Sequence, residues 1–320
     1  MTWLVTGGAG YIGAHVVRAL VRDGASVVVL DDLSTGDASR VEPRAALVAG
    51  SVLDRALVRS VLHEHAVTGV VHIAAKKQVG ESVADPLLYY RENVEGLISL
   101  LEGCREAGVD QFVFSSSAAT YGLPDVDLVH EDTPGVPLSP YGETKLVGEW
   151  LLRDCATAYG LRAMSLRYFN VAGAEFPELG DPGVFNLVPL VFRALSAGER
   201  PKVFGGDYPT PDGTCIRDYV HVADIADAHL AAARALESGA PGATYNIGRG
   251  EGSSVMDVLR VVAEVTGRDV DPEVVERRPG DPARVVAAVD RIREKLGFTA
   301  TRDLEDMVRS AWDGWQHRAG

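Results

Sequence analysis

The sequence is poor in several features that mark specialised protein classes. Its three cysteines, Cys104, Cys155 and Cys215, lie far apart without CxxC spacing, so they indicate neither a disulfide framework nor a zinc site. The chain has no apolar run of about 18 residues, and Met1 leads into a predicted strand without a basic, cleavable leader. We therefore expect reduced thiols and a cytoplasmic protein.

Positive charge is also scarce. The 320 residues include 31 Lys and Arg against 45 Asp and Glu, which gives a formal net charge of −14. Nucleic acids and anionic membranes attract basic surfaces, so this balance argues against either as a partner. The hydrophobic fraction of 46% is ordinary for a globular protein, and a ligand that carries phosphate would have to be held by local groups.

Short β-branched runs alternate with amphipathic stretches from the first residues onward. This alternation predicts a parallel sheet with helices on both faces. We expect strands at 3–6, 26–30, 45–48, 69–73, 111–115 and 162–168. We expect helices at 11–22, 54–65, 87–107, 140–159, 223–237, 253–266 and 304–315. The predicted fold class is α/β, a doubly wound parallel sheet of the Rossmann type with a smaller C-terminal domain.

The texture of the sequence changes after residue 169. Residues 170–217 are rich in Pro, Gly and Asp and show few regular signals, which is typical of binding structure in compact α/β proteins. We expect a nucleotide-binding domain at 1–169, with 218–238 returning to it. Residues 170–217 and 239–320 would form a smaller, partly interleaved substrate-binding domain.

Three glycines mark the junction between the first predicted strand and the first predicted helix. Gly7 permits a tight turn, Gly10 lets the backbone approach a pyrophosphate, and Gly13 lets the helix pack closely on the sheet. The N-terminus of the helix also offers free N–H donors to an anion. Because this turn follows a strand and opens a helix, we predict a dinucleotide site rather than a simple glycine-rich turn.

Two acids end the second predicted strand. Asp31 lies 18 residues beyond Gly13, close to the position where an acid accepts hydrogen bonds from the adenosine ribose. Its neighbour is Asp32, and two carboxylates would repel a 2′-phosphate, so the pair favours NAD over NADP. The alternative is that Asp31 only caps a turn, as aspartate often does.

A tyrosine and a lysine share one face of a predicted helix. Tyr141 and Lys145 lie four residues apart, and Ser115, Ser116 and Ser117 end the fifth predicted strand, where open parallel sheets form their sites. A tyrosine normally loses its proton at about pH 10. We expect the Lys145 ammonium and a positively charged nicotinamide to lower the pKa of Tyr141 toward neutrality, so that it can act as a base.

Together these residues resemble the extended short-chain dehydrogenase/reductase family over nearly the whole chain. Within it the sequence is similar to the UDP-glucose 4-epimerases. The motifs that carry this similarity are VGES at 79–82, SSSAATYG at 115–122, YFN at 168–170, DYPTPDGT at 207–214, RDY at 217–219 and RRPGD at 277–281. The stretch from 207 to 219 is long and specific.

The resemblance implies NAD-dependent inversion at C4 of a UDP-hexose, UDP-galactose or UDP-glucose, through a transient 4-keto sugar. Tyr141 would take the proton of the 4-hydroxyl, and Ser117 would hydrogen-bond the same oxygen. Lys145 would hold the nicotinamide ribose and keep Tyr141 acidic. NAD would be regenerated in each cycle and stay tightly bound, and no metal is implied.

The resemblance also implies two sets of binding residues. The expected NAD site consists of Gly7, Gly10, Tyr11, Ile12, Gly13, Asp31, Asp32, Ser51, Val52, Ile73, Ala74, Ala75, Lys77, Asn93, Ser115, Tyr141, Lys145 and Tyr168. The expected substrate site consists of Lys77, Ser117, Tyr141, Asn170, Asn186, Leu187, Phe204, Arg217, Tyr219, Val285, Arg278 and Asp281. Arg217 and Arg278 have the clearest chemistry, because a diphosphate needs fixed cations in so acidic a protein.

Two positions depart from the family pattern. Ser51 stands where the family usually has an aspartate, so the acceptor for the adenine amino group would be a hydroxyl. Val285 stands where a large tyrosine is associated with exclusion of N-acetylated sugars. Because valine is small, we predict that UDP-GalNAc and UDP-GlcNAc are interconverted as well.

The resembled scaffold also carries other functions. The 4,6-dehydratases of this scaffold have acidic residues after the position of Ser117, where this chain has Ala118 and Ala119, so elimination of water lacks its carboxylates. The catalytic residues fit a 4-epimerase of UDP-glucuronate or of a UDP-pentose equally well. A non-catalytic NAD-sensing regulator commonly lacks the tyrosine-lysine pair, which this chain has.

The resemblance further implies a homodimer formed through the helices at 87–107 and 140–159.

Overall fold

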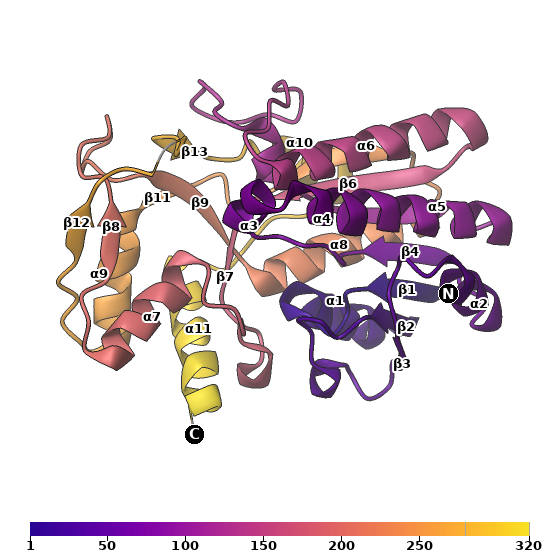
Figure 1. Ribbon diagram of the computed structural model, residues 1–320, viewed down its shortest axis with the longest axis horizontal. Coiled ribbons are helices and arrows are strands. Elements are labelled where there is room, and N and C mark those ends of the chain that lie inside the picture. The colour runs from indigo at the N-terminus through magenta and orange to yellow at the C-terminus, as the bar shows by residue number, and fades with distance from the viewer. Residues whose placement is uncertain (279, 320) are drawn as a thin grey trace.

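A seven-stranded parallel sheet is the centre of the larger part of the molecule (Figure 1). The computed structural model describes residues 1–278 and 280–319. In the order β10-β6-β5-β4-β1-β2-β3, the strands are Ala243–Ile247, Arg162–Tyr168, Gln111–Ser117, Gly69–His72, Thr2–Thr6, Ser26–Asp31 and Ala46–Ala49. The strand order reverses between β1 and β4, where open α/β sheets bind their ligands. The predicted doubly wound fold is confirmed.

Helices cover both faces of this sheet. On one face lie α1 (Tyr11–Arg22) and α8 (Val222–Glu237), and on the other lie α2 (Arg55–Glu64), α5 (Gly96–Ala107) and α6 (Pro140–Tyr159) (Figure 1). Successive residues of β1 alternate between the two cores, because side chains of a strand point to opposite faces. Leu4 packs in the core with α2 and α5, whereas Trp3 and Val5 pack in the core with α1 and α8.

The smaller part of the molecule combines short strands with three longer helices (Figure 1). Its strands are β7 (Asn170–Ala172), β8 (Lys202–Phe204), β9 (Ile216–His221), β11 (Gly252–Ser254), β12 (Glu273–Val275) and β13 (Arg284–Val285). Its helices are α7 (Leu187–Ala197), α9 (Val255–Thr266) and α11 (Leu304–Ala319). Aromatic packing of Phe192 against Trp312 and Trp315 joins α7 to α11 in a separate core.

Three expectations from the sequence need correction. The segment 170–217 contains α7 and parts of several sheets, because its short strands pair with distant partners that local patterns do not reveal. The strand β10, expected in the substrate domain, pairs with β6 in the large sheet. The short helix α10 (Asp290–Leu296) likewise places Ile292 in the core of the large sheet.

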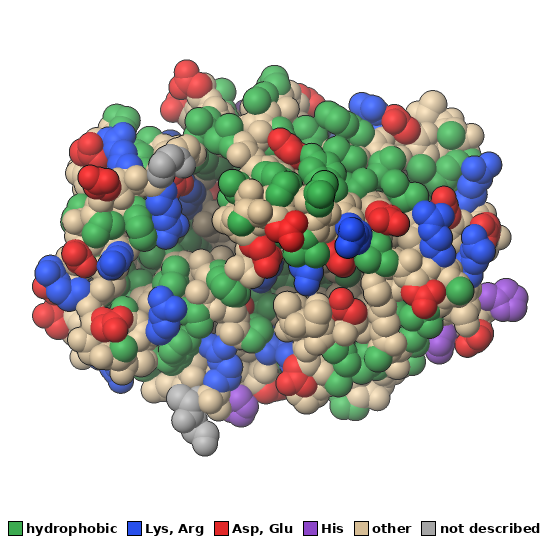
Figure 2. Space-filling view, viewed as in Figure 1, with side chains coloured by type: hydrophobic (Ala, Val, Ile, Leu, Met, Phe, Trp, Pro, Cys, Tyr) green, Lys and Arg blue, Asp and Glu red, His purple; other side chains and the backbone are tan. Residues whose placement is uncertain are grey.

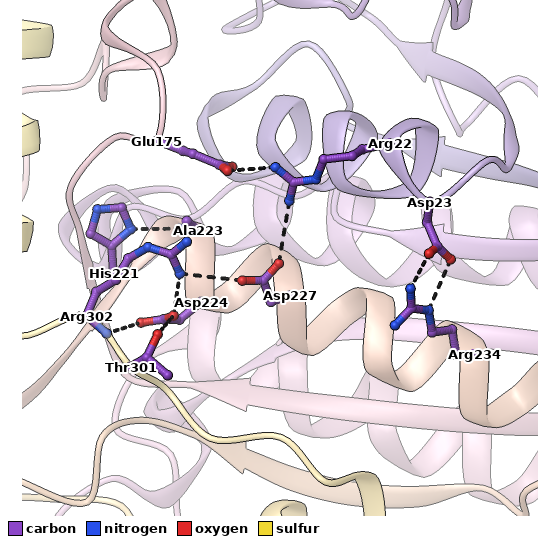
Figure 3. Close-up of polar contacts among 10 residues, drawn as sticks. All are labelled: Arg22, Asp23, Glu175, His221, Ala223, Asp224, Asp227, Arg234, Thr301 and Arg302. Carbon is purple, nitrogen blue, oxygen red and sulfur yellow. Dashed lines mark hydrogen bonds and ion pairs between the residues drawn. The ribbon is translucent and has the colours of Figure 1, made fainter.

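Ion pairs join the two parts of the chain at α8 (Figure 3). Arg22 on α1 lies 2.8 Å from Glu175, which follows β7, and 3.7 Å from Asp227 on α8. Arg302, which precedes α11, lies 2.5 Å from the buried Asp224 and 3.4 Å from Asp227.

Among the helices of the described chain, none has the length and apolar character needed to cross a bilayer.

Candidate active site

The glycine turn closes tightly at the carboxyl end of β1. Gly7 has a φ of 74°, and a Cβ placed on it would lie 2.7 Å from the backbone nitrogen of Ala74. A Cβ placed on Gly13 would lie 2.0 Å from the carbonyl oxygen of Gly7. A side chain at either position would collide with backbone, which is the physical reason for glycine at both.

Helix α1 begins without a side-chain cap. Its N-cap residue Gly10 makes no side-chain hydrogen bond, and its first turn contains no acidic residue. The backbone N–H groups of Tyr11, Ile12 and Gly13 have no partner within the helix and lie at the positive end of its dipole. This side-chain-free cradle of N–H donors fits the pyrophosphate of a dinucleotide.

Asp31 connects the second strand to this turn. Its buried carboxylate accepts hydrogen bonds from the backbone N–H groups of Ala9 and Leu33, both at 2.9 Å. Asp32 is exposed and accepts from the N–H of Ser34 at 2.9 Å. Asp31 therefore shapes the glycine turn and still has lone pairs for a ribose, while the two acids place negative charge where a 2′-phosphate would lie.

Other expected cofactor residues follow the neighbouring strands. Ser51 and the buried Val52 come after β3, and the Ser51 hydroxyl accepts from the N–H of Leu53 at 3.1 Å. The N–H groups of Ile73 and Ala74 donate to the carbonyl of Thr6 at 3.1 Å, which ties the end of β4 to β1. Ala75 and the exposed Lys77 continue this loop.

The helix predicted at 87–107 is interrupted where Asn93 enters the site. Between α4 (Pro86–Tyr89) and α5, residues Tyr90–Glu95 form a π-helical turn. The buried amide of Asn93 accepts from the N–H of Lys76 at 2.8 Å and donates to its carbonyl and to the Thr144 hydroxyl, both at 3.0 Å. This turn therefore holds the loop after β4 against α6, as π turns often do at functional sites.

The three expected catalytic residues meet between the start of α6 and the end of β5. Ser139 caps the first turn of α6, from which Tyr141 projects. Tyr141 is 8% exposed, and the Ser117 side chain lowers the pKa of its phenol against the larger effect of burial. The ammonium of Lys145 is 3% exposed and donates to the carbonyl oxygen of Ser115 at 2.8 Å.

Burial dominates the proton equilibria of this pair. It raises the pKa of Tyr141, while the Ser117 side chain acts in the opposite direction. Burial also lowers the pKa of Lys145 to about 8. The expected lowering of the pKa of Tyr141 by Lys145 is therefore absent from the protein chain alone, because the ammonium points to the carbonyl of Ser115 and desolvation of the phenol prevails.

The two serines before Ser117 are held from opposite faces of the sheet. The hydroxyl of Ser115 lies 2.9 Å from Nε2 of His229 on α8, and the hydroxyl of Ser116 donates to Glu149 on α6 at 2.5 Å. Neither His229 nor Glu149 is among the residues expected from the sequence. The four-residue spacing of Glu149 from Lys145 is the signal that could have identified it.

Most residues expected to bind substrate lie in the smaller part, and two of them are paired with carboxylates. The guanidinium of Arg217 on β9 donates to Asp281 at 2.5 Å, and both are expected substrate contacts. The amide of Asn186, the N-cap of α7, donates to Asp181 at 3.1 Å. These polar groups are therefore preformed and have partners that a ligand could replace.

The remaining expected substrate residues of the smaller part lie on or beside β7, β8, β9, β12 and α7. The guanidinium of Arg278 lies 3.8 Å from the centre of the Phe204 ring, a cation–π contact. The next residue, Pro279, lies outside the described residues. Asn170 on β7 is exposed and pairs in register with the buried Tyr219 on β9, while Leu187 begins α7.

Two expected residues lie at the boundary between the two parts. Tyr168 ends β6 directly opposite Ser117 in register. Val285 pairs in register with Arg217 and packs against Tyr121 and Phe169. The expected catalytic and cofactor residues thus gather at the carboxyl ends of strands of the large sheet and at the starts of α1 and α6, and most expected substrate residues lie on elements of the smaller part.

Known proteins are similar to this chain in sequence and fold. Residues 3–248 match the model of the NAD dependent epimerase/dehydratase family. A UDP-glucose 4-epimerase of Azospirillum brasilense is 47% identical over 314 residues, 96% of this chain and 90% of that protein. The crystal structure of UDP-glucose 4-epimerase from Brucella ovis in complex with NAD is 42% identical, with a TM-score of 0.94 over 97% of each chain. The UDP-glucose-4-epimerase of Stenotrophomonas maltophila, with bound NAD and formylated UDP-arabinopyranose, is 40% identical, with a TM-score of 0.96 over 100% of each chain.

Proposed function

The chain belongs to the NAD dependent epimerase/dehydratase family, and from this premise we propose that it interconverts UDP-galactose and UDP-glucose by inverting C4. The resemblance carried by the motifs is confirmed, and the chain is an epimerase whose cofactor is NAD. The observation that carries the proposal is the buried Tyr141, one turn before Lys145, with a phenol whose pKa responds to the Ser117 side chain.

The cofactor would lie along the carboxyl edge of the sheet. The cradle at the start of α1 would hold the pyrophosphate, Asp31 the adenosine ribose, and Lys145 the nicotinamide ribose. The chemistry that bound NAD supplies is the uptake and return of a hydride at C4, which takes the sugar through a transient 4-keto form. The other expected NAD residues complete this site from the ends of β3, β4 and β6 and from the turn that carries Asn93.

Tyr141 moves the proton of the 4-hydroxyl. Because burial raises its pKa in the chain alone, the phenol needs a nearby positive charge to act as a base. The Lys145 ammonium and the charged cofactor ring supply that charge when the site is loaded. Ser117 holds the same oxygen, and Tyr141 returns the proton after the sugar has turned over.

Arg217 and Arg278 would bind the diphosphate of the substrate. Fixed guanidinium groups suit phosphate because they donate bidentate, charge-assisted hydrogen bonds. Arg217 would exchange its bond with Asp281 for one with the diphosphate, and Asp281 would then be available to the ribose. The other expected substrate residues, Lys77, Asn170, Asn186, Leu187, Phe204, Tyr219 and Val285, would surround the uridine and the sugar.

The sugar could also be a different one on the same carrier. A UDP-pentose is the second candidate, since the Stenotrophomonas maltophila protein has a formylated UDP-arabinopyranose bound. UDP-glucuronate is compatible with the same catalytic residues. The small Val285 supports the further proposal that UDP-GalNAc and UDP-GlcNAc are substrates.

A second copy of the chain is the proposed protein partner. Hydrophobic side chains are visible over the region of α3 (Val79–Ala84) to α6 on one face of the molecule (Figure 2). Val83, Leu87 and Trp150 are 63%, 75% and 48% exposed. Such a patch on neighbouring helices is suited to a twofold interface. We expect light scattering to give the mass of a dimer at micromolar concentration, and a stable monomer would reject this proposal.

Domain limits and cellular location are further proposals. We assign NAD binding to residues 1–169 and 218–238, a range that begins within β9, extended by the strand 243–247 that completes the sheet, and substrate binding to most of the remainder. The cytoplasmic location rests on the three cysteines, all of which are unbridged in the structure.

The decisive experiment follows the sugar directly. The purified protein would be incubated with UDP-galactose without added NAD, and the anomeric signals would be followed by proton NMR. UDP-GalNAc, UDP-glucuronate and UDP-arabinose would be compared under the same conditions. Conversion to the 4-epimer would establish the reaction and retention of the cofactor, and the relative rates would rank the sugars. Absence of turnover for every sugar, even with NAD supplied, would reject the epimerase proposal.

A further inference from the structure

The row of functional residues on α6 extends one turn beyond the catalytic pair. Tyr141, Lys145 and Glu149 follow one another at four-residue spacing, which places them on one face of the helix. All three are buried, with Glu149 9% exposed. A glutamate is rarely so buried unless it has partners, so its contacts indicate why it is there.

Glu149 joins three elements of the fold. One carboxylate oxygen, Oε1, accepts from the Ser116 hydroxyl on β5 at 2.5 Å and from Nε of Arg167 on β6 at 2.8 Å. The other oxygen, Oε2, accepts from Nη2 of Arg167 at 2.5 Å. Ser116 and Arg167 are register partners on adjacent strands, so both side chains leave the sheet on the face that α6 covers.

The arginine of this group is equally well held. Arg167 donates to the carbonyl of Glu131 at 3.0 Å and lies 4.7 Å from the centre of the Tyr121 ring. Burial alone would lower its pKa, yet the bonds and charge of Glu149 raise it overall, so the guanidinium stays charged. A buried ion pair is costly to form and adds little net stability, which makes a role in fixing geometry the better account of it.

The contacts of Glu149 lie directly beside the hydrogen bond of Lys145 on β5. The ammonium of Lys145 donates to the carbonyl of Ser115, the residue directly before Ser116. Two successive residues of β5, Ser115 and Ser116, are therefore hydrogen-bonded to side chains from two successive turns of α6. Any slip of the helix along the strand would break both bonds at once, and it would shift Tyr141 relative to Ser117 in the same movement.

Three side chains act on the charge of Lys145, from α6, β4 and β5. Glu149 favours its charged form, against the larger effect of burial. From β4, His72 faces the ammonium, but burial first and Lys145 second lower the pKa of His72 to about 3, so it is neutral. From β5, the Phe114 ring lies 5.1 Å from the Lys145 nitrogen. Glu149 is thus an acid on α6 that favours the charged form of Lys145, while its direct bonds go to Ser116 and Arg167.

We propose that Glu149 is a positioning residue for catalysis, which together with Ser116 and Arg167 locks α6 against β5 and β6 and thereby holds Tyr141 and Lys145 in place. We refer to these three residues as the buried pin. The inference depends on the proposed function only for the reaction that Tyr141 and Lys145 perform. The contacts of the pin are properties of the chain itself.

Glu149→Gln tests the charge of the pin, because glutamine keeps the shape and one oxygen acceptor. The chain has only five lysines, so lysine labelled with ¹³C at Cε gives few NMR signals, and Lys145→Met assigns the relevant one. We expect the Lys145 midpoint, about pH 8 in the parent protein, to fall to lower pH in the variant because the charge of Glu149 is lost. We expect kcat to fall about tenfold with KM unchanged, and its alkaline limit to move to lower pH with the lysine.

Ser116→Ala tests the geometry of the pin without disturbing the ion pair. This small change should fold normally, and we expect kcat to fall several-fold at unchanged KM and unchanged Lys145 midpoint. Asp154→Asn is the matched control, because it removes a carboxylate from an exposed position of the same helix. It should leave kcat and the titration as they are, and thermal unfolding would verify that each variant is folded.

The outcomes separate this inference from the proposed function. The lysine titration needs no substrate, so an unchanged midpoint in Glu149→Gln together with an unchanged kcat in Ser116→Ala would overturn the pin even in a fully active enzyme. A shifted midpoint in a protein that converts no sugar would support the role of Glu149 in balancing Lys145 and reject the epimerase proposal alone.

Discussion

The floor of the site and its rim are built on different principles. The floor consists of Tyr141, Lys145 and Ser117, which are held by partners on the backbone and in the core. The rim residues Asn186 and Arg217 are instead paired with carboxylates, and the Asp281 side chain that holds Arg217 is 31% exposed. Groups that perform chemistry benefit from a fixed, desolvated setting, whereas groups that recognise a mobile ligand need partners that can be exchanged.

The largest effect is expected at the floor, from Tyr141→Phe. Loss of the phenolic oxygen removes the acid and base for the 4-hydroxyl, so we expect kcat for UDP-galactose to fall about 1,000-fold with little change in KM. Steady-state kinetics with NMR detection would measure this. Tyr159→Phe, at the exposed end of the same helix, is the control and should retain full activity. Equal activity in both variants would remove Tyr141 from the mechanism.

Val285→Tyr tests the space around the sugar, at the boundary between the floor and the rim of the site. Val285 is buried beside Tyr121 and Phe169, and a tyrosine there would narrow the space around the sugar. We expect the rate with UDP-GalNAc to fall by about a hundredfold while the rate with UDP-galactose stays within about threefold. The second sugar serves as the control for folding. Retention of N-acetyl activity in the variant would contradict the assignment of this pocket.

Arg217→Lys should give a smaller effect, confined to binding. Lysine keeps the charge but loses the bidentate geometry, so we expect KM for UDP-galactose to rise about tenfold with kcat nearly unchanged. Arg284→Lys, an exposed neighbour on β13, provides the control. A fall in kcat without a change in KM would mean that Arg217 belongs to the floor rather than to the rim.

The smallest expected effect is on the pH dependence of stability, through the buried His229, whose Nε2 lies 2.9 Å from the Ser115 hydroxyl. Burial lowers the pKa of His229 to about 4, so below pH 6.5 the unfolded chain takes up a proton that the folded chain does not. Stability from this residue is therefore present above about pH 6.5 and is lost as the pH falls toward 4. In His229→Asn, we expect the dependence of the unfolding free energy on pH between 4.5 and 6 to weaken by about 1.4 kcal/mol per pH unit.

Denaturant unfolding at several pH values would measure this slope. His63→Asn is the control, because that side chain is exposed on α2. An identical slope in His229→Asn and in the parent protein would show that His229 has the same pKa in the folded and unfolded chain, which would contradict this prediction.

Local patterns predicted six strands of the large sheet and the helices at 253–266 and 304–315, but they missed β10, the π turn and the short strands of the smaller part. The glycine turn and the helix at 140–159 have signals within a few residues, namely glycine spacing, caps and apolar periodicity, and the structure places both as expected. The strand β10 has no such signal for its partner, since a five-residue strand can join any open sheet edge. The π turn at Asn93 similarly reflects packing against α6 and the loop after β4 rather than local preference.

By itself the sequence determined the glycine turn, the acidic pair at the end of β2, and the tyrosine and lysine proposed for catalysis, because each depends on local spacing along the chain. Only the tertiary structure decided that Ser115 would receive the lysine ammonium, and that Glu149 would meet Ser116 and Arg167 from two separate strands. The reason is physical. The state of a buried charge depends on its desolvation and on partners brought together by packing, and these exist only once the chain has folded.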